Sequence, residues 1–123
     1  PGGWAGDQVN AFTGTGLSAK QKDAQDYFRK VLNWRKTNPV VHSGALKHFA
    51  PENGIYVYFR YNESGKVMVV LNKNQEAKTL DTSRFSEVMA ACTSGKEIIS
   101  GKNITDLNTL NVPAMSAMII ELK

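Results

Sequence analysis

Cysteine is nearly absent from this chain of 123 residues, because Cys92 is the only one. A single thiol excludes an intramolecular disulfide and a multi-thiolate metal site, and it leaves the compartment open. The chain also lacks the run of roughly 20 apolar residues that a membrane-spanning helix needs, so no membrane span is expected. Stability is therefore expected to come from the packing of one core, for which 41% hydrophobic residues are sufficient.

The chain also lacks a cluster of charged residues of one sign. The net charge is +4, but the basic residues form no tract. Residues 1–38 carry 6 Lys or Arg against 3 Asp, whereas residues 39–123 carry 9 against 8 acidic residues. Because a nucleic-acid-binding surface gathers its positive charge into one patch, a nucleic-acid partner is not expected. The chain also has no internal repeat, which argues against a solenoid.

The first third of the chain predicts a loop followed by one helix. Residues 1–17 hold 5 of the 10 glycines, which is typical of an irregular loop. Ser18 followed by Gln21 forms a capping box, which predicts that a helix begins there. Asn38 precedes Pro39, and proline disfavours helical geometry in the residue before it, so the helix should end there. Apolar residues recur at helical spacing and predict one buried face, made of Ala24, Tyr27, Phe28, Val31, Leu32 and Trp34 or Arg35.

After Pro39 the hydrophobic period changes to 2, and the rest of the chain is predicted to be β. Residues 55–62 alternate as in a strand with one dry face, and residues 67–71 are apolar throughout, as in a central strand. The link at residues 62–65 predicts a hairpin between them. Shorter strand candidates are residues 44–49, 77–81, 97–100, 109–112 and 117–122, while residues 82–89 suit a helical turn or a bulged edge. The pattern predicts a mainly β fold, an antiparallel β-sandwich preceded by a loop and one amphipathic α-helix.

Three segments carry a family resemblance. The loop Pro1-Gly2-Gly3-Trp4-Ala5-Gly6-Asp7, then Asn10-Ala11-Phe12-Thr13-Gly14, resembles the segment after the eighth barrel strand in neopullulanase-like and cyclomaltodextrinase-like members of the α-amylase superfamily, glycoside hydrolase family 13. The pattern Leu32-x-x-Arg35-x-x-x-Pro39 before Gly44 is similar to their last barrel helix and its exit. Residues 112–122 resemble the closing strand of their C-terminal β domain, so the resemblance covers the whole chain.

The resemblance implies a division of the chain and a parent enzyme. Residues 1–38 would be the loop and final helix of a (β/α)8 barrel, and residues 39–123 the C-terminal antiparallel β domain. The parent would cleave α-1,4 and α-1,6 bonds of starch, pullulan or cyclodextrins with retention of configuration, a reaction that needs a pair of carboxylates. In the family the catalytic Asp, Glu and Asp come from barrel strands upstream of Pro1. None of the 11 acidic residues here lies in a matching motif, so the chain is expected to cap the barrel, to carry no catalytic residue and no cofactor, and to be inactive alone.

Trp4, Tyr56 and Tyr58 are the candidate saccharide-binding residues. The resemblance places Trp4 near the rim of the substrate cleft, where an indole face packs against a glucose ring; the alternative is that Trp4 plugs the barrel edge. Tyr56 and Tyr58 share one face of a strand and suit either a stacking platform or packing against a second sheet. An independent carbohydrate-binding module for starch-type glucans is accordingly the alternative function.

The remaining candidates receive ordinary structural interpretations. His42 and His48 have no further ligand at metal-binding spacing, so no metal site is expected. Asp7 and Asp81 are interpreted as turn formers. The apolar face of the helix over residues 18–38 is expected to dock on the sheet or to pair with a second copy, because an exposed patch of that size favours association.

Overall fold

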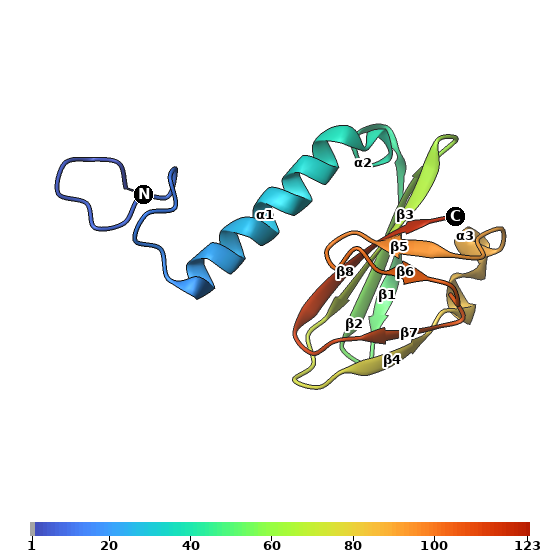
Figure 1. The fold of residues 1–123 in the computed structure, drawn as a ribbon. Coiled ribbons are helices and arrows are strands. Elements are labelled where there is room, and N and C mark those ends of the chain that lie inside the picture. Colours follow the sequence, from blue (N-terminus) through green and yellow to red (C-terminus); the bar gives the residue numbers. More distant parts are fainter. Residues whose placement is uncertain (1) are drawn as a thin grey trace. The chain divides into compact units, whose positions relative to one another are not determined.

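The computed structural model describes residues 2–123, and the chain divides into two compact units, residues 1–33 and 34–123. Helix α1 (Ala19–Thr37) crosses the boundary between them and leads into α2 (Pro39–Ser43) (Figure 1). In the described part of the chain the strands are β1 (Ala45–Glu52), β2 (Ile55–Asn62), β3 (Gly65–Asn72), β4 (Lys78–Asp81), β5 (Gly95–Glu97), β6 (Asn103–Ile104), β7 (Thr109–Val112) and β8 (Ser116–Leu122). The 3-10 turn η1 (Ser83–Phe85) and helix α3 (Ser86–Met89) link β4 to β5.

The capping box predicted for α1 is present. The backbone N–H of Ser18 donates to Gln21 Oε1 at 2.9 Å, and the N–H of Gln21 donates to Ser18 Oγ at 3.3 Å. The two bonds satisfy donors that the first helical turn leaves unpaired. The predicted helix is therefore confirmed, and it ends at Thr37 as expected from Pro39.

A second helix was not predicted. Asn38 caps α2 by accepting the N–H of Val40 at 3.2 Å, and Pro39 occupies the first helical turn, where its missing N–H has no cost. The prediction that everything after Pro39 is β is therefore wrong for residues 39–43. The proline ends one helix and starts the next.

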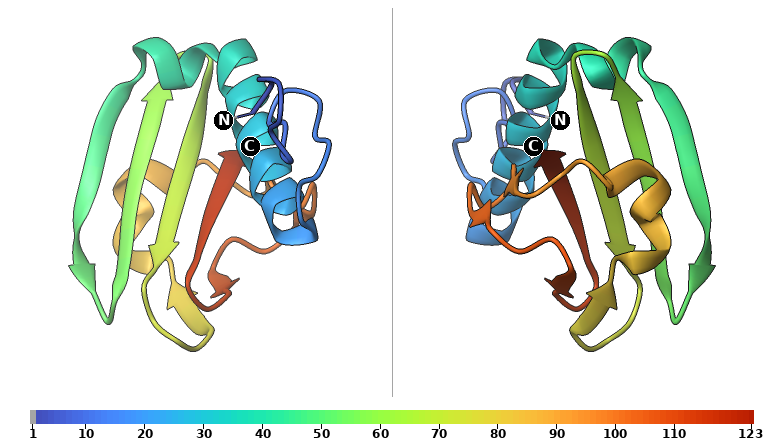
Figure 2. Two further views of the ribbon diagram at one scale, coloured as in Figure 1. Left: turned by 90° about the vertical axis from the view of Figure 1, so that its left-hand side faces the viewer. Right: turned by 90° about the vertical axis from the view of Figure 1, so that its right-hand side faces the viewer.

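The second unit contains the predicted antiparallel sandwich. One sheet of the described residues has the strand order β1-β2-β3-β8-β5-β6, and a smaller one pairs β4 with β7, all antiparallel. The β4–β7 ribbon, η1 and α3 cover one face of the larger sheet. Helix α2 lies at the end of that sheet, above β2 and β3 (Figure 2).

The two hairpins at the start of the sheet fix its register. The predicted hairpin of β2 and β3 is confirmed, and it pairs Asn62 with Gly65. The hairpin of β1 and β2 turns at Asn53 and Gly54, whose φ values of 51° and 75° are both positive. Such a pair matches the right-handed twist of the flanking strands, and Asn-Gly is the preferred sequence for it.

The core lies between the two layers. Strand β2 buries Ile55, Val57 and Phe59 as the alternation predicted, and β3 is buried at each position from Val67 to Val70. Within the predicted segment 82–89, residues 83–89 form η1 and α3, and Phe85, Val88 and Met89 point inward as expected. The buried cluster consists of Ile55, Val57, Phe59, Met68, Val70, Phe85, Val88, Met89, Leu107, Leu110, Val112, Ile120 and Leu122.

The strand predicted at residues 97–100 is wrong in position. Strand β5 covers Gly95–Glu97, and the chain then turns around the Glu97 side chain. Glu97 Oε1 accepts the N–H of Ile99 at 3.0 Å, and Oε2 accepts the N–H of Ser100 at 2.6 Å. A carboxylate that accepts the backbone N–H groups two and three residues further along favours a turn over an extended strand.

Nothing within the unit of residues 1–33 covers the apolar face of α1, and its docking on the sheet or its pairing with a second copy stays a prediction. None of the residues of α1 is buried, and Phe28 and Leu32 keep 63% and 58% of their surface exposed. The spacing of apolar residues shows which face would accept a covering surface, but it does not supply that surface.

Candidate functional site

The N-terminal loop presents Trp4 to solvent. The Trp4 side chain is 79% exposed, and its backbone N–H donates to Asp7 Oδ2 at 3.1 Å while its carbonyl accepts the N–H of Asp7. Asp7 therefore forms a turn, as predicted, and fixes the backbone of the exposed indole. Because the ring lies uncovered, it is available either to a sugar ring or to an apolar surface outside this chain.

Local hydrogen bonds hold the rest of the loop. Asn10 Oδ1 accepts the N–H groups of Phe12 and Thr13 at 2.9 and 3.0 Å. Gln25 Nε2 of α1 donates to the carbonyl of Ala11 at 2.5 Å. The loop is thereby tied to the helix that follows it, although Phe12 stays 85% exposed.

Tyr56 and Tyr58 lie on the outer face of the larger sheet. Their strand neighbours Ile55, Val57 and Phe59 point into the core, so the tyrosines point the opposite way. The expectation that they pack against a second sheet is therefore wrong, since the second sheet covers the other face. Their ring centroids are 5.7 Å apart at an interplanar angle of 36°, and both side chains are partly exposed.

The outer face around Tyr56 and Tyr58 combines aromatic rings with polar groups. His48 of β1 packs its ring edge on Tyr56, with centroids 6.3 Å apart. Burial raises the pKa of Tyr58 above its ordinary value, and the neighbouring Tyr56 adds to this effect while Arg60 opposes it. Tyr58 is therefore a neutral phenol at physiological pH, with an apolar ring and a hydroxyl that can donate or accept.

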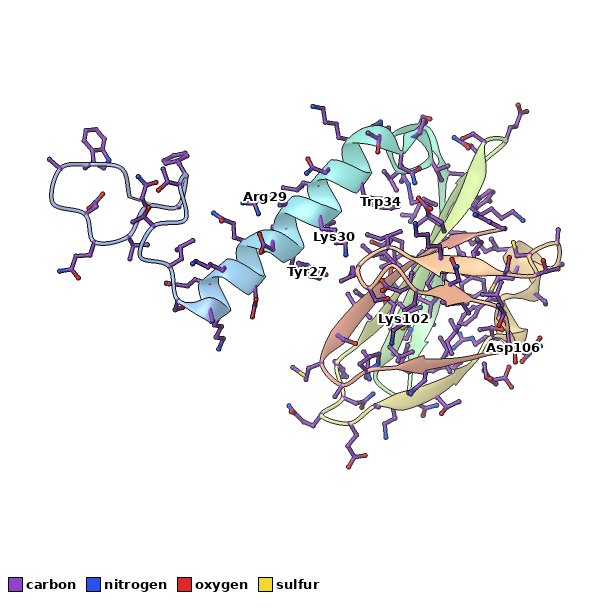
Figure 3. All side chains as sticks on the ribbon, in the orientation of Figure 1. Tyr27, Arg29, Lys30, Trp34, Lys102 and Asp106 are labelled. Carbon is purple, nitrogen blue, oxygen red and sulfur yellow. The ribbon has the colours of Figure 1, made fainter. Side chains whose placement is uncertain are left out.

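A polar joint connects the end of α1 to the last strand. Figure 3 labels Trp34 on α1. The indole Nε1 of Trp34 donates to Glu121 Oε1 at 2.5 Å, and the Asn38 Nδ2 donates to the same oxygen at 3.1 Å. His42 Nε2 lies 2.6 Å from the carbonyl of Arg35, near the end of α1. We call Trp34, Asn38 and Glu121 the helix joint, because one carboxylate there binds the ends of two helices to β8.

A groove of about 670 Å³ opens on the core side of the sheet, between β1 and β2 on one side and β4 and η1 on the other. Its walls combine apolar and charged side chains, among them Phe49, Glu52, Lys78, Leu80, Asp81 and Arg84. Asp81 Oδ1 accepts the N–H of Ser83 at 2.8 Å, and the hydrogen bonds from Ser83 hold the Asp81 pKa below its usual value. Asp81 is therefore an ionised turn former, as predicted, and is poorly suited to act as a general acid.

Metal binding and membrane insertion were also considered for the described residues. Within residues 2–123, no group of three or more His, Cys, Asp or Glu side chains could hold a metal ion. His42 contacts the carbonyl of Arg35, whereas the His48 ring packs on Tyr56, so the two histidines lie in different parts of the second unit. No helix in the described part of the chain is long and apolar enough to cross a membrane.

The structure distributes the three predicted saccharide contacts over two units. Trp4 belongs to the unit of residues 1–33, whereas Tyr56 and Tyr58 belong to the unit of residues 34–123. The helix joint and the groove were missed by sequence reasoning. Trp34 and Glu121 are 87 positions apart, and no local pattern indicates such a contact. The pairing of Asn38 with Pro39 is a known helix start and could have located α2.

The comparisons with known proteins concern both sequence and fold. The family described as Cyclo-malto-dextrinase C-terminal domain matches residues 46–121. An amylopullulanase from Thermoanaerobacterium saccharolyticum is 26% identical over 113 residues, which cover 78% of this chain and 9% of that protein. The chain therefore spans about a tenth of the length of this curated relative.

Several solved structures share the fold, among them the following two. An AmyP variant in complex with maltotriose has a TM-score of 0.76 at 14% identity, over 93% of this chain and 23% of that one. An isomaltulose synthase variant from Erwinia rhapontici, in complex with its natural substrate sucrose, has a TM-score of 0.65 at 23% identity, over 80% and 18% of the two chains.

Proposed function

The chain belongs to the family of cyclo-malto-dextrinase C-terminal domains, and from this we propose that it serves as the non-catalytic C-terminal β domain of an α-glucan-degrading glycoside hydrolase. The family match, an amylopullulanase relative and the fold shared with AmyP support the proposal. A (β/α)8 barrel of this class needs about 250 residues, and the 123 residues here form a helix and a sandwich instead. The catalytic carboxylates would therefore belong to the preceding part of the parent enzyme.

The helix joint is the observation that carries the proposal. One end of α1 is hydrogen-bonded to β8 through Glu121, while Phe28 and Leu32 further along the helix are exposed. A helix whose last turns bond to the β unit and whose earlier turns carry large apolar side chains suits an element shared with a second body. We propose that residues 1–38 are the loop and last helix of the barrel, and that residues 39–123 cap it.

The simplest test of the role is enzymatic. The chain is incubated with pullulan and with soluble starch, and reducing ends are measured against a buffer control. We expect none above background, because retaining hydrolysis needs two carboxylates and we propose that both lie in the barrel of the parent enzyme. Release of reducing ends would refute the assignment of a non-catalytic domain.

A second test addresses the parent protein. The coding sequence upstream of Pro1 should encode a barrel with the Asp, Glu and Asp of the family at its strand ends. An initiator codon directly before Pro1, with no barrel sequence preceding it, would overturn the proposal.

Alone, the chain should cover its apolar helix face by self-association, because exposed patches of this kind favour contact. We expect light scattering to show a dimer or larger species that dissociates in a variant carrying both Phe28→Glu and Leu32→Glu. A strict monomer at high concentration for the unmodified chain would contradict this expectation.

The second candidate function is an independent carbohydrate-binding module for starch-type glucans. It is favoured by the partly exposed Tyr56 and Tyr58 rings, 5.7 Å apart, and by the exposed Trp4. Calorimetric titration with maltooligosaccharides distinguishes it from a purely structural domain. Binding that is lost in Tyr56→Ala and Tyr58→Ala variants, or in Trp4→Ala, would support the module.

A further inference from the structure

Strand β1 forms one margin of the larger sheet (Figure 2). It pairs with β2 on one side, and within the described part of the chain no strand pairs with its other side. β1 has 8 residues, whereas β6 at the opposite margin has 2. A long unpaired strand presents a row of free backbone donors and acceptors that can pair with a strand of another chain. Of the two margins, β1 is therefore the one that needs protection.

Lys47 is a cation on the core-facing side of β1. Its cross-strand partner on β2 is Phe59, which has 0% exposure, and cross-strand partners share one face of a sheet. The Lys47 side chain nevertheless keeps 38% of its surface exposed, and its Nζ lies 3.0 Å from Glu87 Oε1 of α3. A strand added beside β1 would take water from this ion pair, and the removal of water from charged groups costs free energy.

The end of β1 carries two further features that oppose pairing. The register with β2 is irregular between Phe49 and Glu52, and Pro51 lies within this irregularity. Proline has no N–H to donate, so an added strand would lack one hydrogen bond there. An irregular register also bends and twists a strand, which disturbs continuous pairing along its edge.

Arg84 of η1 contacts the same end of β1. Its Nη2 donates to the carbonyl of Ala50 at 3.2 Å, and its Nη1 lies 2.7 Å from Glu52 Oε2. The guanidinium also lies 6.0 Å from the centroid of the Phe49 ring. One side chain thus engages a backbone acceptor, a carboxylate and an aromatic ring of β1. An incoming strand would have to displace Arg84 before it could use the Ala50 carbonyl.

We propose that Lys47 and Arg84 protect the edge of β1, and that without them β1 pairs with β1 of a second copy of this chain. Two identical edges can meet antiparallel about a twofold axis, so that each strand contributes the same residues. The inward cation, the proline and the occupied carbonyl all oppose this pairing. The proposal does not depend on the function proposed above, because it concerns contacts within residues 45–89.

The test uses the full chain carrying Phe28→Glu and Leu32→Glu, so that the helix face does not contribute to association. Lys47→Val and Arg84→Ala are introduced into this background singly and together, since valine suits a strand position beside Phe59. Sedimentation velocity measures the mass over a range of concentrations. We expect a monomer for the background chain and a dimer or larger species for the double variant, with association at least about 10-fold tighter.

Hydrogen exchange locates the contact. Backbone pairing along the edge should slow the exchange of amides within residues 45–49 as the concentration of the double variant rises. Leu46 alternates with Lys47 and so lies on the other face of β1, where its side chain is 58% exposed. Leu46→Lys adds a charge at the edge and should return the double variant toward monomer.

Matched substitutions elsewhere remove the same charges. Lys96→Val lies on β5, which is paired on both sides, by β6 and by β8. Arg29→Ala lies on α1, where Arg29 pairs with Asp26. Both should leave the mass of the background chain unchanged. Association of these controls as tight as that of the double variant would attribute the effect to lost charge alone and would contradict the proposal.

Three further results would overturn the proposal. The first is a folded double variant that associates no more tightly than the background chain. The others are association without slower exchange within residues 45–49, and association that Leu46→Lys leaves unchanged, since either would place the contact elsewhere. Thermal unfolding followed by circular dichroism verifies that each variant is folded. If Arg84→Ala does not fold, Lys47→Val decides the question, because the exposed ion pair that it removes contributes little to stability.

Discussion

The two units of the chain differ in where their large apolar side chains lie. In the β unit Phe59, Met68 and Ile120 have 0% exposure, whereas in the N-terminal unit Phe12 and Trp4 are 85% and 79% exposed. The β unit thus contains its own core. The N-terminal unit has no buried residue among residues 2–33 and is ordered by local hydrogen bonds.

The comparison shows what each kind of order contributes. Full burial of a side chain such as Phe59 contributes about 1.5 to 3 kcal/mol, while a local hydrogen bond contributes about 0.5 to 1.5 kcal/mol net. Order in the N-terminal unit is therefore weak by itself, and its exposed aromatics are suited to be covered by a partner. This asymmetry supports the proposal that residues 1–38 complete a barrel.

Replacing one phenylalanine by alanine in each unit should change the free energy of unfolding by very different amounts. Phe59→Ala leaves a cavity in the core and should lower the free energy of unfolding by about 3 to 5 kcal/mol. At a protein concentration low enough to keep the chain monomeric, Phe28→Ala removes a side chain that is 63% exposed and should change it by less than about 0.5 kcal/mol. Urea denaturation followed by Trp34 fluorescence in a Trp4→Phe background measures both.

Equal losses of unfolding free energy in Phe59→Ala and Phe28→Ala would contradict the difference between the two units. They would mean that Phe28 is as covered in solution as Phe59 is. A loss for Phe28→Ala that appears only as the protein concentration rises is the result expected from the proposed self-association of the helix face.

Glu97 is a buried carboxylate whose hydrogen bonds should stabilise the β unit. Glu97 is 6% exposed and accepts the N–H groups of Ile99, Ser100 and Ile119. Glu97→Gln keeps the shape but places an amide donor against these N–H groups, so it should cost about 1 to 3 kcal/mol at pH 7. Chemical denaturation at pH 7, compared with the exposed Glu63→Gln, provides the measurement.

The same residue gives a pH dependence of known sign. Burial would raise the pKa of Glu97, but the hydrogen bonds from Ser100, Ile99 and Ile119 outweigh it and hold the pKa below its usual value. The stabilisation is therefore complete above the unfolded-state pKa and is lost as the pH falls through the folded-state pKa. The stability gap between the unmodified chain and Glu97→Gln should shrink at low pH, and a constant gap from pH 7 to pH 3 would contradict this account.

The fold could be predicted to a large extent because its signals are local. Alternation over residues 55–62 and the apolar run at residues 67–71 gave the central hairpin, and Ser18 with Gln21 gave the start of α1. The failures came from competing local effects. The Glu97 carboxylate turned the chain where an apolar run had suggested a strand.

The candidate site could be predicted only in part. Alternation placed Tyr56 and Tyr58 on one face, but the face that the second sheet covers depends on the order of strands, which pattern alone does not give. The groove brings residues of β1 and β2 together with residues of β4 and η1. Such long-range juxtapositions depend on tertiary packing and leave no trace in residue spacing.

The helix joint lies within the unit of residues 34–123, and its loss should have a smaller effect on stability. Glu121→Leu leaves the indole N–H of Trp34 and the Asn38 amide without their acceptor, at a cost of about 1 to 2 kcal/mol. Glu121→Gln keeps a side-chain oxygen and should lose less than half as much. The expected signature is a red shift of Trp34 fluorescence in Glu121→Leu, and an unshifted spectrum would show that the joint is not held in solution.

The smallest global effect is expected at the start of α1. Ser18→Ala removes one half of the capping box and should weaken the first helical turn by about 1 kcal/mol. Because that turn adds nothing to the buried core, circular dichroism at 222 nm should fall while the Trp34-monitored unfolding of the β unit stays unchanged. Ser18→Asp restores a capping acceptor and should recover the signal. Loss of β-unit stability in Ser18→Ala would show that the N-terminal unit supports the sandwich after all, and that the two units do not keep their order separately.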